Sequence, residues 1–441
     1  MRRIVSRQVA FTACLTLLFS CPAAIAVGQG TAASPPSTTE IERRAFLFFW
    51  NETAPTTGLT KDRAKNIIDK DEYTVASIAS TGYALAALPI GVQHGWVKKQ
   101  DAYNRALISL RFLNSKLPNE HGFFYHFVDW KTGERQWKCE LSSVDTGLLV
   151  IGGLVCGQYF KGSEVQRLAN ALYDRVDWRW MRQAGATDVS ATPPTMSMGW
   201  HPESGWINAR WQGYSEASFL YLLAMGAPEG KDLPGSVWTQ WDVKPATLEG
   251  LDVLGGPGPI FMAQMCPGYF DLRGLADRQN YNWWQNFVNA HRAQVLFCRR
   301  HEDKFASFKG GVWGITASDQ PQGYGAEAPV ESEADGTIAP SAFLAGMLFV
   351  PEASERALKT LWALPERDKF WGRYGFSNAL NVDKNWYDPD VIGLDLGMTL
   401  LALENRNTGL VWRLMRSHPM AKKAFLAAGM HPVTDTSYPG K

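Results

Sequence analysis

The sequence predicts an all-α fold, specifically an (α/α)6 barrel (toroid) of six inner and six outer helices, with long loops forming one rim. Segments that are apolar almost all round recur at intervals of roughly 50 to 75 residues, and helices of this kind are buried ones. Amphipathic, charged segments alternate with them, and few stretches have the two-residue alternation of strands. This alternation indicates an inner and an outer layer of helices.

The predicted inner helices are small-residue-rich and apolar. They begin near Ser77, Val144, Ser215, Ala290, Thr337 and Gly393. The charged segments 98–114, 163–177 and 351–361 are expected to belong to the outer layer. The Gly-, Trp- and Pro-rich stretches 184–212 and 306–336 are long loops, and loops of such length are usually functional. We expect them to build one rim of the barrel.

The N-terminus has the pattern of an export signal, predicted over residues 1–26. Basic residues precede a short apolar run at 9–19, and Ala24-Ile25-Ala26 matches an A-x-A cleavage site. A lipoprotein box ending at Cys21, with a lipid anchor there, is the alternative. Both interpretations of the N-terminus predict an exported protein that is periplasmic or secreted.

The remaining chain is divided by composition. Residues 27–39 are rich in Gly, Ser, Thr, Pro and Ala, as linkers are, and a single catalytic domain is predicted over 40–430, followed by a tail at 431–441. Its 44 basic and 43 acidic residues argue against a nucleic-acid or anionic-membrane partner. No later apolar run is long enough to span a bilayer. We expect a monomer.

The cysteines and histidines do not form a recognisable metal or cofactor motif. Cys139, Cys156, Cys266 and Cys298 match no paired-cysteine spacing and are interpreted as buried thiols. The eight histidines include no zinc-binding pair at helical spacing, and there is no phosphate-binding glycine loop. The segment 213–217 departs from the serine-hydrolase elbow, because Ala stands where its second Gly belongs. We therefore predict no cofactor and no metal.

Three acids open apolar helices, and they are the candidate catalytic residues. Glu216 lies among aromatic residues, and an apolar environment keeps a carboxyl protonated near neutral pH. Asp145 and Asp395 have the same position in their segments, although each can also be a capping or helix-dipole residue. Asp335 precedes a glycine and can be a turn residue, whereas Glu404 near a helix end is interpreted as a structural ion-pair partner. Paired carboxylates of this kind are the machinery of glycoside hydrolysis.

Aromatic side chains support a carbohydrate ligand, because sugars pack their C–H faces against flat rings at the edge of a cleft. The chain has 18 Trp, several of them in predicted loops. The candidate substrate-binding residues are Trp206, Arg210, Trp211, Tyr214, Tyr269, Arg273, Trp313, Asp335 and Trp386.

The chain resembles the bacterial glucoamylase-like (glycoamylase) domain family and the related glycoside hydrolase family 144. The matching segments are 77–83, 142–146, 172–178, 214–216, 269–274, 313–319, 335–340 and 393–397. They occur in order over about residues 40–420, so the resemblance covers essentially the whole predicted domain. It implies an (α/α)6 barrel, an endo-acting hydrolase of β-1,2-glucan, and Glu216 as the match to an essential glutamate.

The sequence departs from the family pattern beside Asp145. The family's β-1,2-glucanases have an acid at the position of Ser142 and a glutamate at that of Asp145. The departure bears on the role of Asp145 and on the linkage cleaved.

Two classes of function remain open. One is a secreted β-glucan hydrolase, and the other is a non-catalytic glucan-binding protein. Among enzymes, a β-1,2-glucosyltransferase or sophorose-releasing enzyme of the same fold is the alternative. Carboxylates facing each other from different inner helices leave room for a water molecule, which predicts inversion. Glu216 is then the general acid and Asp395 the base, while Asp145 orients the substrate or tunes the pKa of Glu216.

Overall fold

The computed structural model describes residues 34–68, 71–183 and 194–439. The predicted export signal, including Cys21, lies outside these residues, as do most of the predicted linker and part of the loop 184–212. Helix α1 begins at Thr38, so the last two linker residues are helical, and the Ser37 side chain accepts a hydrogen bond from the Glu40 amide. None of the helices in the described ranges has the length and apolarity needed to cross a bilayer.

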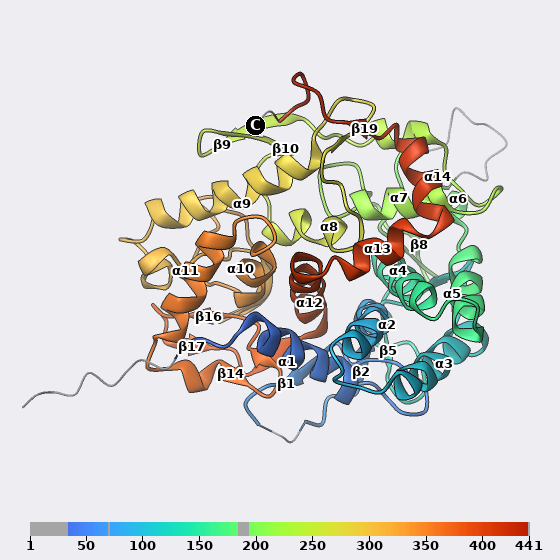
Figure 1. The fold of residues 1–441 in the computed structure, drawn as a ribbon, viewed down its shortest axis with the longest axis horizontal. Coiled ribbons are helices and arrows are strands. Elements are labelled where there is room, and N and C mark those ends of the chain that lie inside the picture. Colours follow the sequence, from blue (N-terminus) through green and yellow to red (C-terminus); the bar gives the residue numbers. More distant parts are fainter. Residues whose placement is uncertain (1–33, 69–70, 184–193, 440–441) are drawn as a thin grey trace, which may run out of the picture. The chain divides into compact units, whose positions relative to one another are not determined.

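The fold is mostly helical, with fourteen α-helices among the described residues (Figure 1). These are α1 (Thr38–Asn51), α2 (Ile78–Gln93), α3 (Lys99–Ser115), α4 (Ser143–Tyr159), α5 (Glu164–Asp174), α6 (Trp178–Met181), α7 (Ser218–Gly226), α8 (Met265–Tyr269), α9 (Trp283–Arg300), α10 (Pro340–Gly346), α11 (Pro351–Trp362), α12 (Gly393–Asn407), α13 (Leu410–Arg416) and α14 (Pro419–Ala428).

Short strands occupy the connections between helices. They are β1 (Arg63–Lys65), β2 (Val75–Ser77), β3 (Asn119–Glu120), β4 (Phe123–Phe124), β5 (Phe127–Asp129), β6 (Leu141–Ser142), β7 (Gly199–His201), β8 (Gly205–Trp206), β9 (Pro245–Leu248), β10 (Leu251–Leu254), β11 (Leu275–Ala276), β12 (Ala317–Gln320), β13 (Gly323–Ala326), β14 (Trp371–Gly372), β15 (Gly375–Phe376), β16 (Leu380–Asn381), β17 (Trp386–Tyr387), β18 (Asp390–Ile392) and β19 (His431–Pro432). All their named pairings are antiparallel. They are too short to produce the alternation by which strands are recognised in a sequence.

Three buried helices begin immediately after a short strand. β2 runs into α2, β6 into α4 and β18 into α12. The Ser77 and Ser142 hydroxyls, at the ends of β2 and β6, accept hydrogen bonds from the amides of Ser80 and Asp145. Because a serine cap satisfies an otherwise unpaired amide, it fixes where the helix starts. The strands pair with other loops and therefore hold these helix starts in place.

The buried helices pack closely. Figure 1 shows α12 near the centre of the view, where it contacts α1, α2, α8 and α10. α4 packs against α2, α5 and α7. Glycines allow the closest approach, since a Cβ at Gly152 would lie 1.9 Å from the Gly82 carbonyl oxygen. The small residues of the predicted inner helices are therefore explained by α2–α4 contact.

Most of the predicted helices form. α2, α4, α7, α10 and α12 match predicted buried segments, and α3, α5 and α11 match amphipathic ones. The prediction for the segment at Ala290 is corrected, because it belongs to the longer α9, which exposes Arg292 and Leu296 while burying His291 and Phe297. α9 is thus amphipathic, and its apolar stretch was too short to reveal the exposed face.

Residues at the periphery of the domain are also ordered by specific contacts. The predicted tail pairs through β19 with β11.

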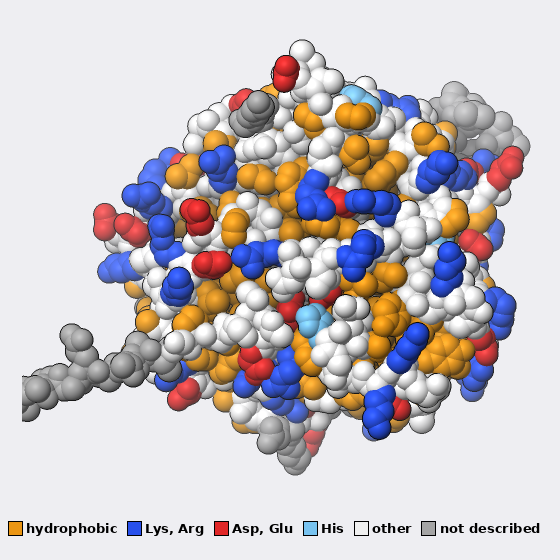
Figure 2. Space-filling view, in the orientation of Figure 1, with side chains coloured by type: hydrophobic (Ala, Val, Ile, Leu, Met, Phe, Trp, Pro, Cys, Tyr) orange, Lys and Arg blue, Asp and Glu red, His pale blue; other side chains and the backbone are white. Residues whose placement is uncertain are grey.

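The four described cysteines are free and buried, as expected. Glu404 is fully buried, and its Oε2 lies 2.7 Å from Nε2 of His94, so it has a structural pairing partner of the kind expected. On the face drawn in Figure 2, acidic and basic side chains are interspersed, in keeping with the balanced charge.

Candidate active site

A cavity of about 280 Å³ lies at the N-terminal ends of the buried helices. Its lining includes the residues at the starts of α2, α4, α8 and α12 and the turn before α7. The lining residues are Asp62, Arg63, Ser77, His126, Phe127, Val144, Asp145, Leu148, Glu216, Phe261, Met265, Ala317, Tyr324, Ile392, Leu394 and Asp395. The three predicted catalytic acids are therefore brought together in one cavity, as the positions of their helices predicted.

Glu216 lies in the turn two residues before α7, so it precedes the helix that was expected to contain it. Burial raises the pKa of Glu216 to about 7, and the nearby charge of Asp145 acts in the same direction. A carboxyl with a pKa near neutrality is half protonated at physiological pH and can donate that proton.

Asp395 lies in the first turn of α12 and is almost completely buried. Burial raises the pKa of Asp395 to about 7, while a hydrogen bond of 2.5 Å from Nδ2 of Asn378 opposes that shift. Gly393 and Gly397 flank it in the sequence, but they leave no open space beside it. A Cβ at Gly393 would meet Ser80, and one at Gly397 would meet the Tyr83 ring. These glycines allow neighbouring side chains to pack against the start of α12.

Asp145, in the first turn of α4, is held by two neighbours. The Ser142 hydroxyl donates to its Oδ2 at 2.5 Å, and Nε2 of His126 lies 3.5 Å from its Oδ1. Nδ1 of His126 lies 3.0 Å from the Glu140 carboxylate. Burial alone would lower the pKa of His126, but Asp145 and Glu140 outweigh it and raise the pKa to about 9. The imidazolium therefore has a carboxylate partner on each ring nitrogen.

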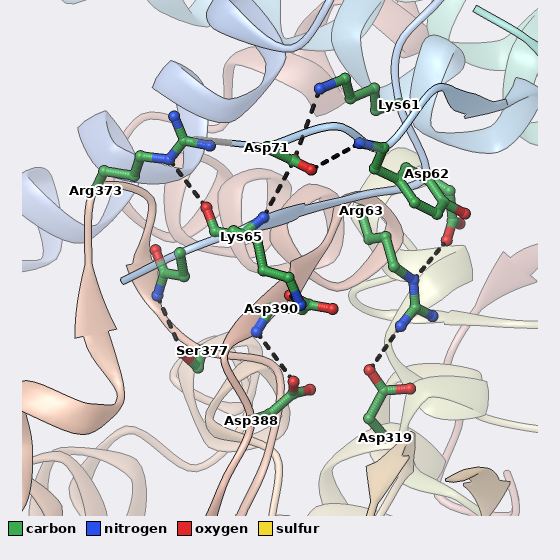
Figure 3. A network of polar contacts seen from close by, with 12 residues as sticks. Lys61, Asp62, Arg63, Lys65, Asp71, Asp319, Arg373, Ser377, Asp388 and Asp390 are labelled. Carbon is green, nitrogen blue, oxygen red and sulfur yellow. Dashed lines mark hydrogen bonds and ion pairs between the residues drawn. The ribbon is translucent and has the colours of Figure 1, made fainter. Parts of the chain in front are cut away.

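A charged network forms another wall of the cavity (Figure 3). Arg63 donates to Asp62 through Nε at 3.2 Å and to Asp319 through Nη1 at 2.8 Å. Burial raises the pKa of Asp62, and the Arg63 guanidinium opposes the shift. Tyr324, opposite Asp319 in the β12–β13 hairpin, exposes 62% of its surface and lines the cavity. It is the exposed aromatic ring of this site.

The predicted aromatic residues near Glu216 support the cavity rather than line it. Trp211 is buried and donates from Nε1 to the Ser143 hydroxyl at 2.8 Å. Tyr214 stacks on Trp283, and its hydroxyl accepts from Asn286. Neither side chain is in the lining. The prediction of direct substrate contact is corrected for the buried Trp211, whereas that for the partly exposed Tyr214 stays a prediction.

Arg210 and Trp206 lie away from the cavity lining. Arg210 donates to Gln183 and to the Thr195 carbonyl, which directs its guanidinium to that loop. Trp206 in β8 packs on Trp180, with ring centroids 4.6 Å apart. The loop placement that suggested ligand contact instead reflects aromatic packing of the loops themselves.

Two further predicted contacts belong elsewhere. Tyr269 is fully buried at the end of α8 and stacks on Tyr83. Arg273 pairs with Asp271 at 2.8 Å and covers the Trp412 ring. The end of α8 points away from the cavity, which is formed by helix starts, so neither residue lines it.

The remaining predicted contacts lie on the other loops. Trp313 is fully buried against His291 and is therefore a core residue. Asp335 pairs with Lys384 at 2.5 Å and accepts from the Thr337 amide, the turn role that was its alternative. Trp386 lies in β17, paired with Asn381 of β16. None of the three lines the cavity. Substrate contact is corrected for the fully buried Trp313, whereas for the partly exposed Asp335 and Trp386 it stays a prediction.

The sequence interpretation missed most of the lining residues. Among them, Asp62, Arg63, His126 and Tyr324 come from short strands and their flanking turns. The criterion of an acid opening an apolar helix could not select them. The adjacent charges of Asp62 and Arg63 are a weak signal, because such pairs are common on exposed loops.

The chain is similar to known carbohydrate-active proteins over most of its length. Residues 208–419 match the glycoamylase family, described as "Putative glucoamylase". A "putative glucoamylase" structure from Bacteroides fragilis has a TM-score of 0.82 and 26% identity, covering 92% of this chain and all of that one. An endo-β-1,2-glucanase structure from Chitinophaga pinensis has a TM-score of 0.81 and 25% identity, covering 90% and 99%.

A curated relative is an exo-β-1,2-glucooligosaccharide sophorohydrolase (non-reducing end) from Parabacteroides distasonis, 26% identical over 421 residues. The alignment covers 87% of this chain, but the chain spans only about half, 56%, of that relative. Together with the match over residues 208–419, these similarities confirm the resemblance found in the sequence: the chain is similar to the glycoamylase family.

Proposed function

We propose that this protein is a glycoside hydrolase that cleaves β-1,2-glucan, built on an (α/α)6 barrel whose helix starts form the active site. The observation that carries the proposal is the cavity in which Glu216 and Asp395, each with a pKa raised to about 7, lie with Asp145. Mere binding of a neutral sugar does not require three acids in one cavity, since removing carboxyls from water costs free energy.

Glu216 is proposed as the general acid. It donates its proton to the glycosidic oxygen as the bond to the anomeric carbon breaks. Asp395 accepts a proton from the water that attacks the anomeric carbon from the opposite face, which gives an inverted product. Asp145 does not exchange protons in this scheme. Its charge raises the pKa of Glu216, in agreement with the second role expected for it.

The position of Ser142 bears on the departure from the family pattern. The relatives are expected to have an acid there, whereas this chain has a hydroxyl that donates to Asp145. A hydroxyl holds the Asp145 carboxylate without adding a further negative charge to the cavity. We therefore assign Asp145 to positioning and leave both proton transfers to Glu216 and Asp395.

Endo-action is proposed on the basis of the likeness to the endo-β-1,2-glucanase structure, which has a TM-score of 0.81 and is matched over 99% of its length. Exo-release of sophorose is the second candidate, favoured by the activity of the sophorohydrolase relative.

The test is the product profile from linear β-1,2-glucan, with β-1,3- and β-1,4-glucans as controls. Endo-hydrolysis predicts a ladder of oligosaccharides early in the reaction and an equal rise in reducing ends. Sophorose as the sole early product would instead indicate an exo-acting enzyme that releases sophorose. New linkages without added reducing ends would indicate a transferase, and binding without any product would leave a glucan-binding protein.

A further inference from the structure

A cluster of three aspartates lies beside the cavity, outside the set of proposed catalytic groups (Figure 3). Asp319 comes from β12, Asp388 from the turn after β17 and Asp390 from β18. Each offers a carboxylate oxygen, and these oxygens all lie within 4.8 Å of one another. Opposite ligands of a calcium ion are about 5 Å apart, since Ca²⁺–O distances are about 2.3–2.6 Å. The cluster therefore has the dimensions of a calcium site.

Two cations already neutralise part of this cluster. Nη1 of Arg63 lies 2.8 Å from Oδ2 of Asp319, and Nζ of Lys65 lies 2.7 Å from Oδ1 of Asp390. The third acid, Asp388, has no such partner among the described residues. Asp388 is thus the acid of the three that, within the described ranges, lacks a cationic side chain as partner.

The carboxylate of Asp388 gives independent support for a cation site. It is 3% exposed, and its Oδ1 accepts a hydrogen bond from the Asp390 amide at 3.0 Å. Its other oxygen, Oδ2, is buried and has no hydrogen-bond donor. An unsatisfied buried carboxylate oxygen is costly, and ordered buried polar atoms normally have a partner.

We propose that Asp319, Asp388 and Asp390 bind a divalent, oxygen-preferring cation, with Ca²⁺ the better fit. Carboxylate oxygens are hard ligands, and calcium accepts irregular sets of them that are completed by water or carbonyl oxygens. Magnesium requires nearly ideal octahedral geometry and retains more of its water, which makes it the weaker candidate.

The bound cation would connect two parts of the cavity wall. β12 belongs to the hairpin that carries Tyr324, and β18 leads directly into α12, which carries Asp395. Asn378 already bridges them, because it accepts from the Asp319 amide and donates to Asp395. The cation therefore has a structural role: it ties the hairpin to the start of α12.

The test is calcium binding by the full-length chain after removal of divalent ions with EDTA. Calorimetric titration with CaCl₂ is expected to give one site per chain, and the thermal midpoint is expected to rise by at least about 2 °C at saturation. MgCl₂ is the comparison and should bind at least about tenfold more weakly. Absence of binding heat with both salts in the wild-type chain would overturn the proposal.

Variants locate the site. Asp388→Asn, which leaves a carbonyl oxygen but removes the charge, should lose at least about tenfold in calcium affinity. Asp390→Asn is the second variant if the first does not fold, as judged by circular dichroism. Asp232→Asn is the matched control, because Asp232 is a partly buried acid paired with Lys423 at another site. If the cluster variants keep wild-type calcium binding, or if the control loses as much, the assignment is wrong.

Discussion

At the scale of single residues, the proposed mechanism depends on the protonation of Glu216 and Asp395. Both carboxyls have a pKa of about 7, and burial is the main cause in each case. The two differ in what opposes that shift. Asp395 accepts a side-chain hydrogen bond from Asn378, whereas the opposing contact of Glu216 is with its own backbone. This difference allows the two carboxyls to be tested separately.

Glu216→Gln should remove hydrolysis while leaving the fold intact. Glutamine keeps the size and polarity of glutamate but has no transferable proton, and general acid catalysis contributes typically ~10²–10⁴-fold. The measurement is kcat on β-1,2-glucan, with the thermal midpoint as a check on folding. Retention of more than about a tenth of the wild-type rate would exclude Glu216 as the acid.

Asn378→Ala should shift one limb of the pH profile. The Asn378 hydrogen bond lowers the pKa of Asp395, so its loss raises that pKa and Asp395 becomes ionised only at higher pH. Since the base must be ionised, the acidic limb of kcat/KM moves upward. The alkaline limb, which reports loss of the Glu216 proton, should not move. An upward shift of the alkaline limb instead would reverse the two assignments.

At the scale of elements, helix starts were predictable and strand residues were not. A capping serine followed by an apolar run identifies α2 and α4 from local sequence, and their packing then brings their first turns together. Asp62 and His126 reach the cavity from short strands whose position is fixed only by pairing with distant segments. The sequence around Asp62 and His126 does not indicate with which distant segments these strands pair. The two residues could therefore not be assigned to the site from the sequence.

The same limit explains why aromatic residues that are buried were predicted to contact the substrate. Trp313 and Trp211 were correctly placed outside the long apolar helices, but a loop position does not distinguish an exposed ring from a buried one. In this fold the loops have an apolar core of their own, and rings such as Trp180 and Trp206 pack there. Tyr324 remained exposed because the hairpin holds it at the cavity.

Close packing of α2 on α4 gives a prediction for stability. Gly152→Ala places a Cβ 1.9 Å from the Gly82 carbonyl oxygen, a backbone atom that cannot rotate away. Overpacking costs typically about 1–3 kcal/mol, and we expect at least about 2 kcal/mol here. The neighbouring Gly153→Ala is the matched control, because its Cβ would meet nothing closer than 3.8 Å and alanine favours the helix. Urea denaturation of both variants checks the difference; equal midpoints would contradict the packing.

At the scale of the whole molecule, the proposed chemistry requires that helices distant in the sequence present their starts to one substrate. α4, the turn before α7 and α12 supply Asp145, Glu216 and Asp395 from three separate parts of the chain. Carboxyls on different helices can leave a separation of ~6.5–9.5 Å for the attacking water, the arrangement of inverting enzymes, whereas retaining enzymes need ~5–5.5 Å. The stereochemical outcome therefore reports on the whole arrangement.

Proton NMR of linear β-1,2-glucan during its reaction with the full-length protein tests the central claim most directly, because one spectrum reports cleavage and stereochemistry together. The account predicts new reducing ends that appear first as the α-anomer and then mutarotate, with no such signal for Glu216→Gln. A β-anomer formed first would contradict inversion and the role of Asp395. Absence of new reducing ends with the wild-type protein would contradict hydrolysis itself.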